Sequence, residues 1–144
     1  MQVYAGEDFF IAPFGETVGF GWDGMAYGGG AALGYGDGSA IGLRFLYAQD
    51  TYNFVFMELQ CFLRVYFFNL NANTGPFVQV SGGPVIYADT MPGISGHGNI
   101  SAGISAGWRF SAGEHWYMEP VVRTGYPYLF GAGISTGFRT GGKK

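Results

Sequence analysis

Lysine is almost absent from this sequence. Its only lysines are Lys143 and Lys144, at the end of 144 residues. Charged residues make up 12% of the chain, against about 25% in ordinary soluble domains. The net charge is -3, and no basic stripe is available to meet phosphates. Nucleic acid is therefore not an expected partner.

Two further absences narrow the fold class. The single cysteine, Cys61, cannot form an internal disulfide and is best interpreted as a small hydrophobic residue. No apolar run approaches the ~18 residues of a membrane-spanning helix. The first residues, M-Q-V-Y-A-G-E, lack the basic region and apolar core of a signal peptide. Either a signal has been removed ahead of Met1, which is the interpretation that we favour, or the protein is not exported.

Glycine and aromatic residues are abundant instead, with 27 glycines and 19% aromatics. They follow a strict two-residue alternation, which is clearest in the stretch N-I-S-A-G-I-S-A-G-W-R from Asn99 to Arg109. Large apolar residues occupy one set of alternate positions, and Ser, Gly and Arg occupy the other. The pattern recurs from Tyr128 to Arg139. This period is typical of β-strands with two different faces.

The alternation predicts eight strands joined by sequential hairpins, in one domain over residues 1–144 with a tail at 140–144. The expected strands cover residues 2–12, 25–35, 39–48, 54–67, 76–87, 99–110, 115–124 and 128–139. The two longest loops are expected at residues 13–24 and 89–98, with shorter turns at the end that carries the termini. Hairpins with no helix between them predict an all-β, eight-stranded antiparallel up-and-down β-barrel.

The polar face indicates which solvent surrounds this barrel. It carries small residues, which suit the crowded interior of an eight-stranded barrel better than a water-exposed sheet. It also carries all five arginines and three acids, and arginine suits fixed ion pairs away from bulk water. The expected lumen-lining charges are Asp8, Arg44, Glu58, Arg64, Arg109, Glu119, Arg123 and Arg139.

The other face is apolar along almost the whole length of each strand, which favours a lipid-facing band. Its aromatic residues gather at strand ends, as rings do at the two membrane–water boundaries. The expected girdle residues are Tyr27, Tyr35, Tyr47, Phe67, Trp108, Phe110, Trp116, Tyr126, Tyr128 and Phe138. The sequence therefore predicts a transmembrane β-barrel whose main partner is the lipid bilayer.

Three phrases, G-N-I-S-A-G-I-S-A-G-W-R-F, Y-G-G-G-A-A-L-G-Y-G and Y-L-F-G-A-G-I-S-T-G-F-R, resemble strands of small bacterial outer-membrane barrels of the OmpA, OmpX and OmpW type. The resemblance covers the whole chain as a pattern of alternation, glycine and aromatics. It implies a bacterial outer-membrane location. It also implies recognition by the outer-membrane assembly machinery through an aromatic residue in the last strand, here Phe138.

No pattern points to catalysis, a cofactor or a metal. His97 and His115 lack neighbouring ligands, and neither a serine nucleophile motif nor a phosphate-binding loop is present. We expect a non-enzymatic protein that is structural or a narrow passive channel, and five cations against three acids would favour small polar or anionic solutes. The alternatives are a surface adhesin acting through loops 13–24 and 89–98, and a soluble, lipocalin-like ligand-binding barrel.

Overall fold

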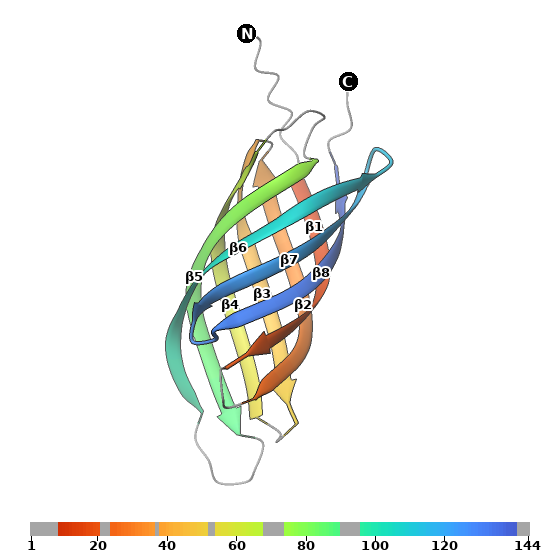
Figure 1. Cartoon of the computed structure of the whole chain (residues 1–144). Coiled ribbons are helices and arrows are strands. Elements are labelled where there is room, and N and C mark those ends of the chain that lie inside the picture. The colour runs from red at the N-terminus through yellow and green to blue at the C-terminus, as the bar shows by residue number, and fades with distance from the viewer. Residues whose placement is uncertain are drawn as a thin grey trace.

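Eight antiparallel strands form a closed barrel in the computed structural model, which describes residues 9–20, 24–36, 38–51, 54–67, 74–89 and 96–140. Each strand pairs with its neighbours in sequence, and the last pairs with the first. The strands are β1 (Phe9–Gly19), β2 (Met25–Gly36), β3 (Ser39–Asp50), β4 (Phe54–Tyr66), β5 (Gly75–Asp89), β6 (His97–Ala112), β7 (Trp116–Tyr126) and β8 (Phe130–Arg139). The predicted eight-stranded up-and-down fold is confirmed (Figure 1).

No helix in the described part of the chain is long and apolar enough to cross a bilayer.

The first strand differs most from its prediction. The sequence predicts that this strand ends at Ala12, before a loop over residues 13–24, but β1 continues through Pro13 to Gly19. Proline lacks the N–H that a ladder needs, and it therefore argues against a strand interior. Here Pro13 pairs with Ala31 of β2, while the ladder with β8 skips from Ile11 to Phe14. The predicted loop therefore shrinks to the connection at residues 20–24, and the predicted strand residues 2–8 lie outside the described residues.

The predicted contrast in connection length between the two ends of the barrel is wrong. The longest connection, between Tyr66 and Gly75, lies at the end where β1 begins and β8 ends, which we call the terminal end. At the opposite end, the loop end, the connections span residues 20–24, 51–53, 90–96 and 127–129. His97 and Gly98, expected in a loop, begin β6. The adhesin alternative thus loses most of its first loop and part of its second.

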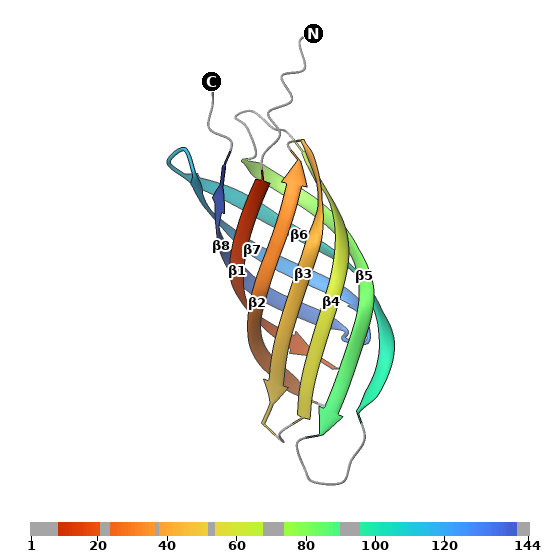
Figure 2. The ribbon, with the colours of Figure 1, turned by 180° about the vertical axis from the view of Figure 1, so that it is seen from behind.

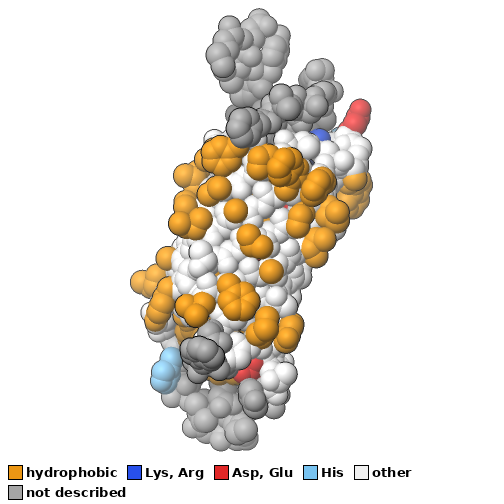
Figure 3. All heavy atoms as spheres, viewed as in Figure 1, with side chains coloured by type: hydrophobic (Ala, Val, Ile, Leu, Met, Phe, Trp, Pro, Cys, Tyr) orange, Lys and Arg blue, Asp and Glu red, His pale blue; other side chains and the backbone are white. Residues whose placement is uncertain are grey.

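The polar face of each strand points into the barrel and the apolar face points out. Ile104 and Trp108 are 55% and 47% exposed, whereas Arg109 and Arg123 are 1% and 5% exposed. Apolar side chains are spread over the outer wall from one end to the other (Figure 3). This orientation contradicts the soluble, lipocalin-like alternative, because a barrel in water would bury the apolar face instead.

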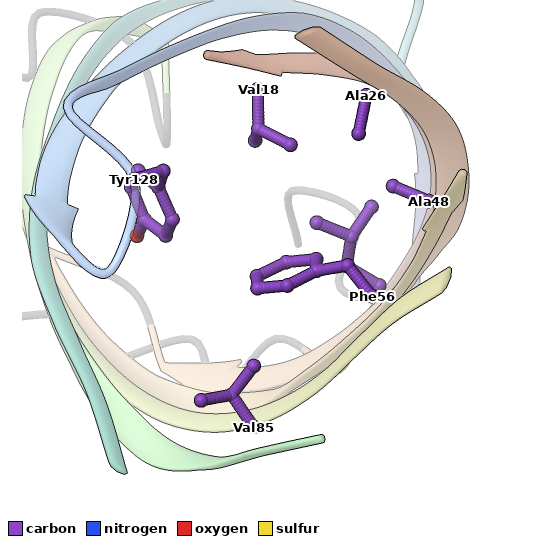
Figure 4. Close-up of a cluster of buried hydrophobic side chains, with 7 residues drawn as sticks. Val18, Ala26, Ala48, Phe56, Val85 and Tyr128 are labelled. Atoms are coloured by element: carbon purple, nitrogen blue, oxygen red, sulfur yellow. The ribbon is translucent and has the colours of Figure 1, made fainter. Parts of the chain in front are cut away.

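Apolar residues also fill part of the interior. One buried cluster lies towards the loop end and consists of Val18, Ala26, Leu46, Ala48, Phe56, Val85 and Tyr128 (Figure 4). A second cluster lies towards the terminal end and consists of Phe10, Ala12, Ala32, Ala40, Phe62 and Tyr117. Strands β1 to β5 form one wall around these clusters (Figure 2), and β5 to β8 form the other. The charged side chains occupy the interior between and beside these clusters.

Candidate functional site

A group of four buried charges joins four strands across the barrel. Glu16 of β1 accepts hydrogen bonds from Arg44 of β3 and Arg123 of β7. Glu58 of β4 accepts a hydrogen bond from Arg123 Nη1 at 2.9 Å, and its Oε2 lies 3.5 Å from Arg44 Nη1. All four residues are at most 9% exposed. In this four-charge network, two carboxylates balance two guanidinium groups.

Neutral groups add further hydrogen bonds around the four-charge network. Gln60 Nε2 donates to Glu58 Oε1 at 2.8 Å and to Ser101 Oγ at 3.1 Å. Arg123 Nη1 also donates to the Tyr128 hydroxyl at 2.9 Å, and the Arg123 guanidinium lies 4.0 Å from the centroid of that ring. Hydrogen bonds of this kind offset the cost of removing charges from water.

The inward glycines of β8 make room for these side chains. A Cβ atom on Gly131 would lie 2.8 Å from Glu16 Oε1 and 3.0 Å from Arg123 Cγ. A Cβ atom on Gly137 would collide with the ring of Tyr117. The small residues of the polar face therefore match large residues that reach across the lumen from other strands.

A second group contains three charges and lies nearer the terminal end. Glu119 Oε1 of β7 accepts hydrogen bonds from Arg64 Nη1 of β4 at 2.8 Å and from Arg109 Nε of β6 at 2.5 Å. Gln79 Oε1 accepts two more from Arg64, at 3.0 and 2.8 Å, and Ser135 Oγ donates to Glu119 Oε2 at 3.2 Å. This three-charge network holds two positive charges and one negative charge.

Aromatic rings cover the faces of the guanidinium groups. Arg109 Cζ lies 3.8 Å from the centroid of Tyr117, and Arg64 Cζ lies 4.1 Å from that of Phe77. Arg109 Cζ also lies 5.1 Å from the centroid of Phe10, which belongs to the apolar cluster at the terminal end. Contacts between a desolvated cation and a ring are attractive, so the interior mixes apolar and charged groups without separating them.

A cavity of about 40 Å³ lies between the two networks. Its charged lining residues come from both networks and are Glu16, Arg44, Arg64, Glu119 and Arg123. Gln79, Ser105 and Ser135 add neutral polar groups. A polar cavity needs roughly 10–15 Å³ of such volume for each water molecule, so this one has room for only a few small species.

The structure places six of the eight predicted lumen charges in these two networks. The seventh, Arg139, is also buried, and its Nε donates to the Glu114 carbonyl at 2.9 Å. The eighth, Asp8, lies outside the described residues.

The sequence analysis does not identify Glu16, which pairs with two arginines, because the glycines and Pro13 predict a loop over residues 13–24. The available signal was the inward alternation of Phe10, Ala12 and Phe14, which continues through Glu16 to Val18.

Nine of the ten predicted girdle residues lie on the outer face, near the strand ends. They are Tyr27, Tyr35, Tyr47, Phe67, Trp108, Phe110, Trp116, Tyr126 and Phe138. The prediction for Tyr128 is wrong, because this side chain is fully buried in the loop-end cluster (Figure 4). β8 begins only at Phe130, so Tyr128 belongs to the β7–β8 turn and not to the strand alternation. Its ring turns inward, where its hydroxyl meets Arg123.

The remaining candidate ligands are scattered over the described part of the barrel. Cys61 is exposed on the outer face, His97 begins β6, and the His115 ring lies 5.5 Å from that of Phe138. Within the described ranges, no three His, Cys, Asp or Glu side chains gather as metal ligands.

No family model and no curated protein matches this chain. Among solved structures, it is similar to the N-terminal β-barrel domain of OprF from Pseudomonas aeruginosa, with a TM-score of 0.62 and 17% identity over 94% of this chain and 99% of that chain. It is also similar to Neisserial surface protein A, with a TM-score of 0.69 and 10% identity over 94% of this chain and 97% of that chain.

A third similar structure comes from the de novo design of transmembrane β-barrels, with a TM-score of 0.55 and 14% identity over 97% of this chain and all (100%) of that chain. Identities this low show the fold alone. The chain thus has the closed eight-stranded fold of transmembrane barrels, and its predicted resemblance to small outer-membrane barrels is confirmed as a structural similarity.

Proposed function

We propose that this chain is an integral protein of a bacterial outer membrane, without enzymatic activity and with a structural role. The observation that carries the proposal is the outer face of a closed barrel, which is covered mainly by apolar side chains. Ile41, Ile100 and Val122 are among the most exposed side chains of the described strands. Between the aromatic belts, no charged side chain of these strands lies on the outer face. Lipid is the solvent that suits such a wall.

The filled interior supports a structural role over an open pore. The four-charge network links β1, β3, β4 and β7, and the three-charge network links β4, β6 and β7. Apolar side chains pack at both ends of this charged layer. A solute crossing the lumen would have to separate buried ion pairs and leave their charges unpaired, which is costly.

A narrow passive channel for small polar or anionic solutes is the second candidate. It is favoured by the cavity between the networks and by its arginine lining. Conduction would require the two networks to open transiently, because their ion pairs fill the lumen. The selectivity of the open pore would then come from the charges that line it.

Planar-bilayer recording separates these two candidates. We first expect the refolded protein to require detergent or lipid, and to migrate differently on gels with and without heating. Inserted into a bilayer, it should then give no steady current in potassium chloride across the accessible voltage range. A reproducible unit conductance that disappears when the protein is heat-unfolded would establish the channel and refute the closed structural role. A protein soluble without detergent would refute membrane residence itself.

A further inference from the structure

The two charge networks of the barrel interior differ in their net charge. The four-charge network is neutral, whereas Arg64 and Arg109 face the single carboxylate Glu119. Arg64 and Arg109 are 6% and 1% exposed, so bulk water does little to screen them. Among the described residues, this network therefore keeps one positive charge without a counter-charge. A buried charge in this condition is costly unless an opposite charge approaches it.

The neighbouring cavity provides hydrogen-bond donors that have nothing to donate to. Ser105 and Gln79 line the cavity, and each is only 4% exposed. The Ser105 hydroxyl and the Gln79 amide nitrogen have no hydrogen-bond partner in the described part of the chain. The Gln79 oxygen already accepts two hydrogen bonds from Arg64, so the remaining polar group of this side chain is its NH₂, which is a donor.

We propose that this cavity binds one small monovalent inorganic anion of the size of chloride or bromide. The donors would be the Ser105 hydroxyl and the Gln79 amide, and Arg64, which also lines the cavity, would supply the attracting charge. The volume of about 40 Å³ admits a halide or a few water molecules and excludes larger organic anions. The anion completes the charge balance of the three-charge network. The site does not depend on conduction, because a closed barrel can hold a bound ion.

Bromide tests the site directly. Crystals grown in sodium bromide should show an anomalous scattering peak inside the cavity, between Ser105 and Gln79. Water molecules alone in the cavity, with no bromide peak, would overturn the proposal.

Two matched glutamine variants test the charge argument in solution. Gln79→Glu places a carboxylate beside Arg64, where it replaces the anion. Gln60→Glu makes the same change beside Glu58, in the network that is already balanced. Urea unfolding of the refolded barrel in lipid vesicles is compared in sodium bromide and in sodium gluconate at equal ionic strength.

For the unaltered protein, the urea midpoint should be higher in bromide than in gluconate and should rise further with bromide concentration, as for a ligand that binds only the folded state. Gln79→Glu should lose this difference and match the bromide-bound protein in both salts. Gln60→Glu should lower the midpoint in both salts and keep the bromide effect. A bromide effect that is undiminished in Gln79→Glu would overturn the proposal, because the anion would then bind elsewhere.

Discussion

Glu119 is the carboxylate that pairs with both arginines of the three-charge network, near the terminal end of the barrel. Its Oε1 accepts hydrogen bonds from both Arg64 and Arg109, and its Oε2 accepts one from Ser135. The side chain is 1% exposed. Removing its charge would leave two guanidinium groups buried together without a counter-charge, which is far more costly than losing an exposed pair.

Glu119→Gln should therefore lower the free energy of unfolding by about 3–5 kcal/mol, as breaking a buried ion pair typically does. The measurement is urea unfolding of the refolded barrel in lipid vesicles, followed by tryptophan fluorescence. Glu114→Gln is the matched control, because Glu114 is exposed in the β6–β7 turn and contributes its backbone carbonyl to Arg139. This control should change the free energy by no more than about 0.5 kcal/mol. Equal stability of the two variants would show that the Glu119 contacts contribute nothing.

At this scale, the sequence indicated which side chains face inward but not which of them meet. The alternation places Arg123 on the polar face, yet its partner Glu16 lies 107 residues away and comes together with it only when the barrel closes. The stagger of the strands decides such pairings, and no local pattern records it. Tyr128 was misplaced for a related reason, since a residue in a turn no longer obeys the alternation of the strand that follows.

At the scale of the strand, three outward-facing prolines interrupt the hydrogen-bond ladders of the barrel. At each proline, the residue pairing with one neighbouring strand is missing. The gap lies between β1 and β8 at Pro13, between β4 and β5 at Pro84, and between β6 and β7 at Pro120. Each proline remains paired in register with its other neighbouring strand. The missing N–H explains why only one side of each strand is affected. In lipid, the facing backbone groups have no water to replace the lost bond.

Pro120→Val should close the gap between β6 and β7, because valine supplies an N–H and keeps an apolar outward side chain. We expect amide hydrogen exchange to slow in the peptide that covers Met118 to Val122. Pro76→Val is the control, since Pro76 stands at the end of the β4–β5 ladder, where its carbonyl accepts a hydrogen bond from Phe67 N, and its missing N–H leaves no gap within a ladder. Unchanged exchange in the Pro120 variant would mean that the gap has a cause other than the missing donor.

The sequence predicted the strands better than their ends. Seven of them repeat the apolar and polar alternation from turn to turn, and their existence followed from that period alone. β1 was cut short because Pro13 and the glycines after it are signals for a loop in an ordinary sheet. In this barrel, glycine and proline lie in strand interiors, so the same residues do not end β1.

At the scale of the whole molecule, the barrel is closed both around its wall and along its axis. Two backbone hydrogen bonds extend the pairing of β1 with β8 beyond the ends of the strands. Leu129 N donates to the Gly19 carbonyl at 2.9 Å, and Thr140 N donates to the Phe9 carbonyl at 3.0 Å. Along the axis, two apolar clusters and two charge networks fill the lumen. The molecule thus presents an apolar wall to its surroundings and keeps its arginines inside.

That assignment of faces is tested most directly by a scan of single cysteines along β6, from Ile100 to Ala106, in a Cys61→Ser background. Each variant is refolded into lipid vesicles and treated with a thiol-reactive spin label, whose collisions with oxygen dissolved in the bilayer are then measured. Residues 100, 102, 104 and 106 should label readily and be accessible to oxygen, whereas residues 101, 103 and 105 should resist labelling until urea unfolds the barrel. The reverse pattern, with Ser105 accessible from lipid and Ile104 shielded, would contradict the account.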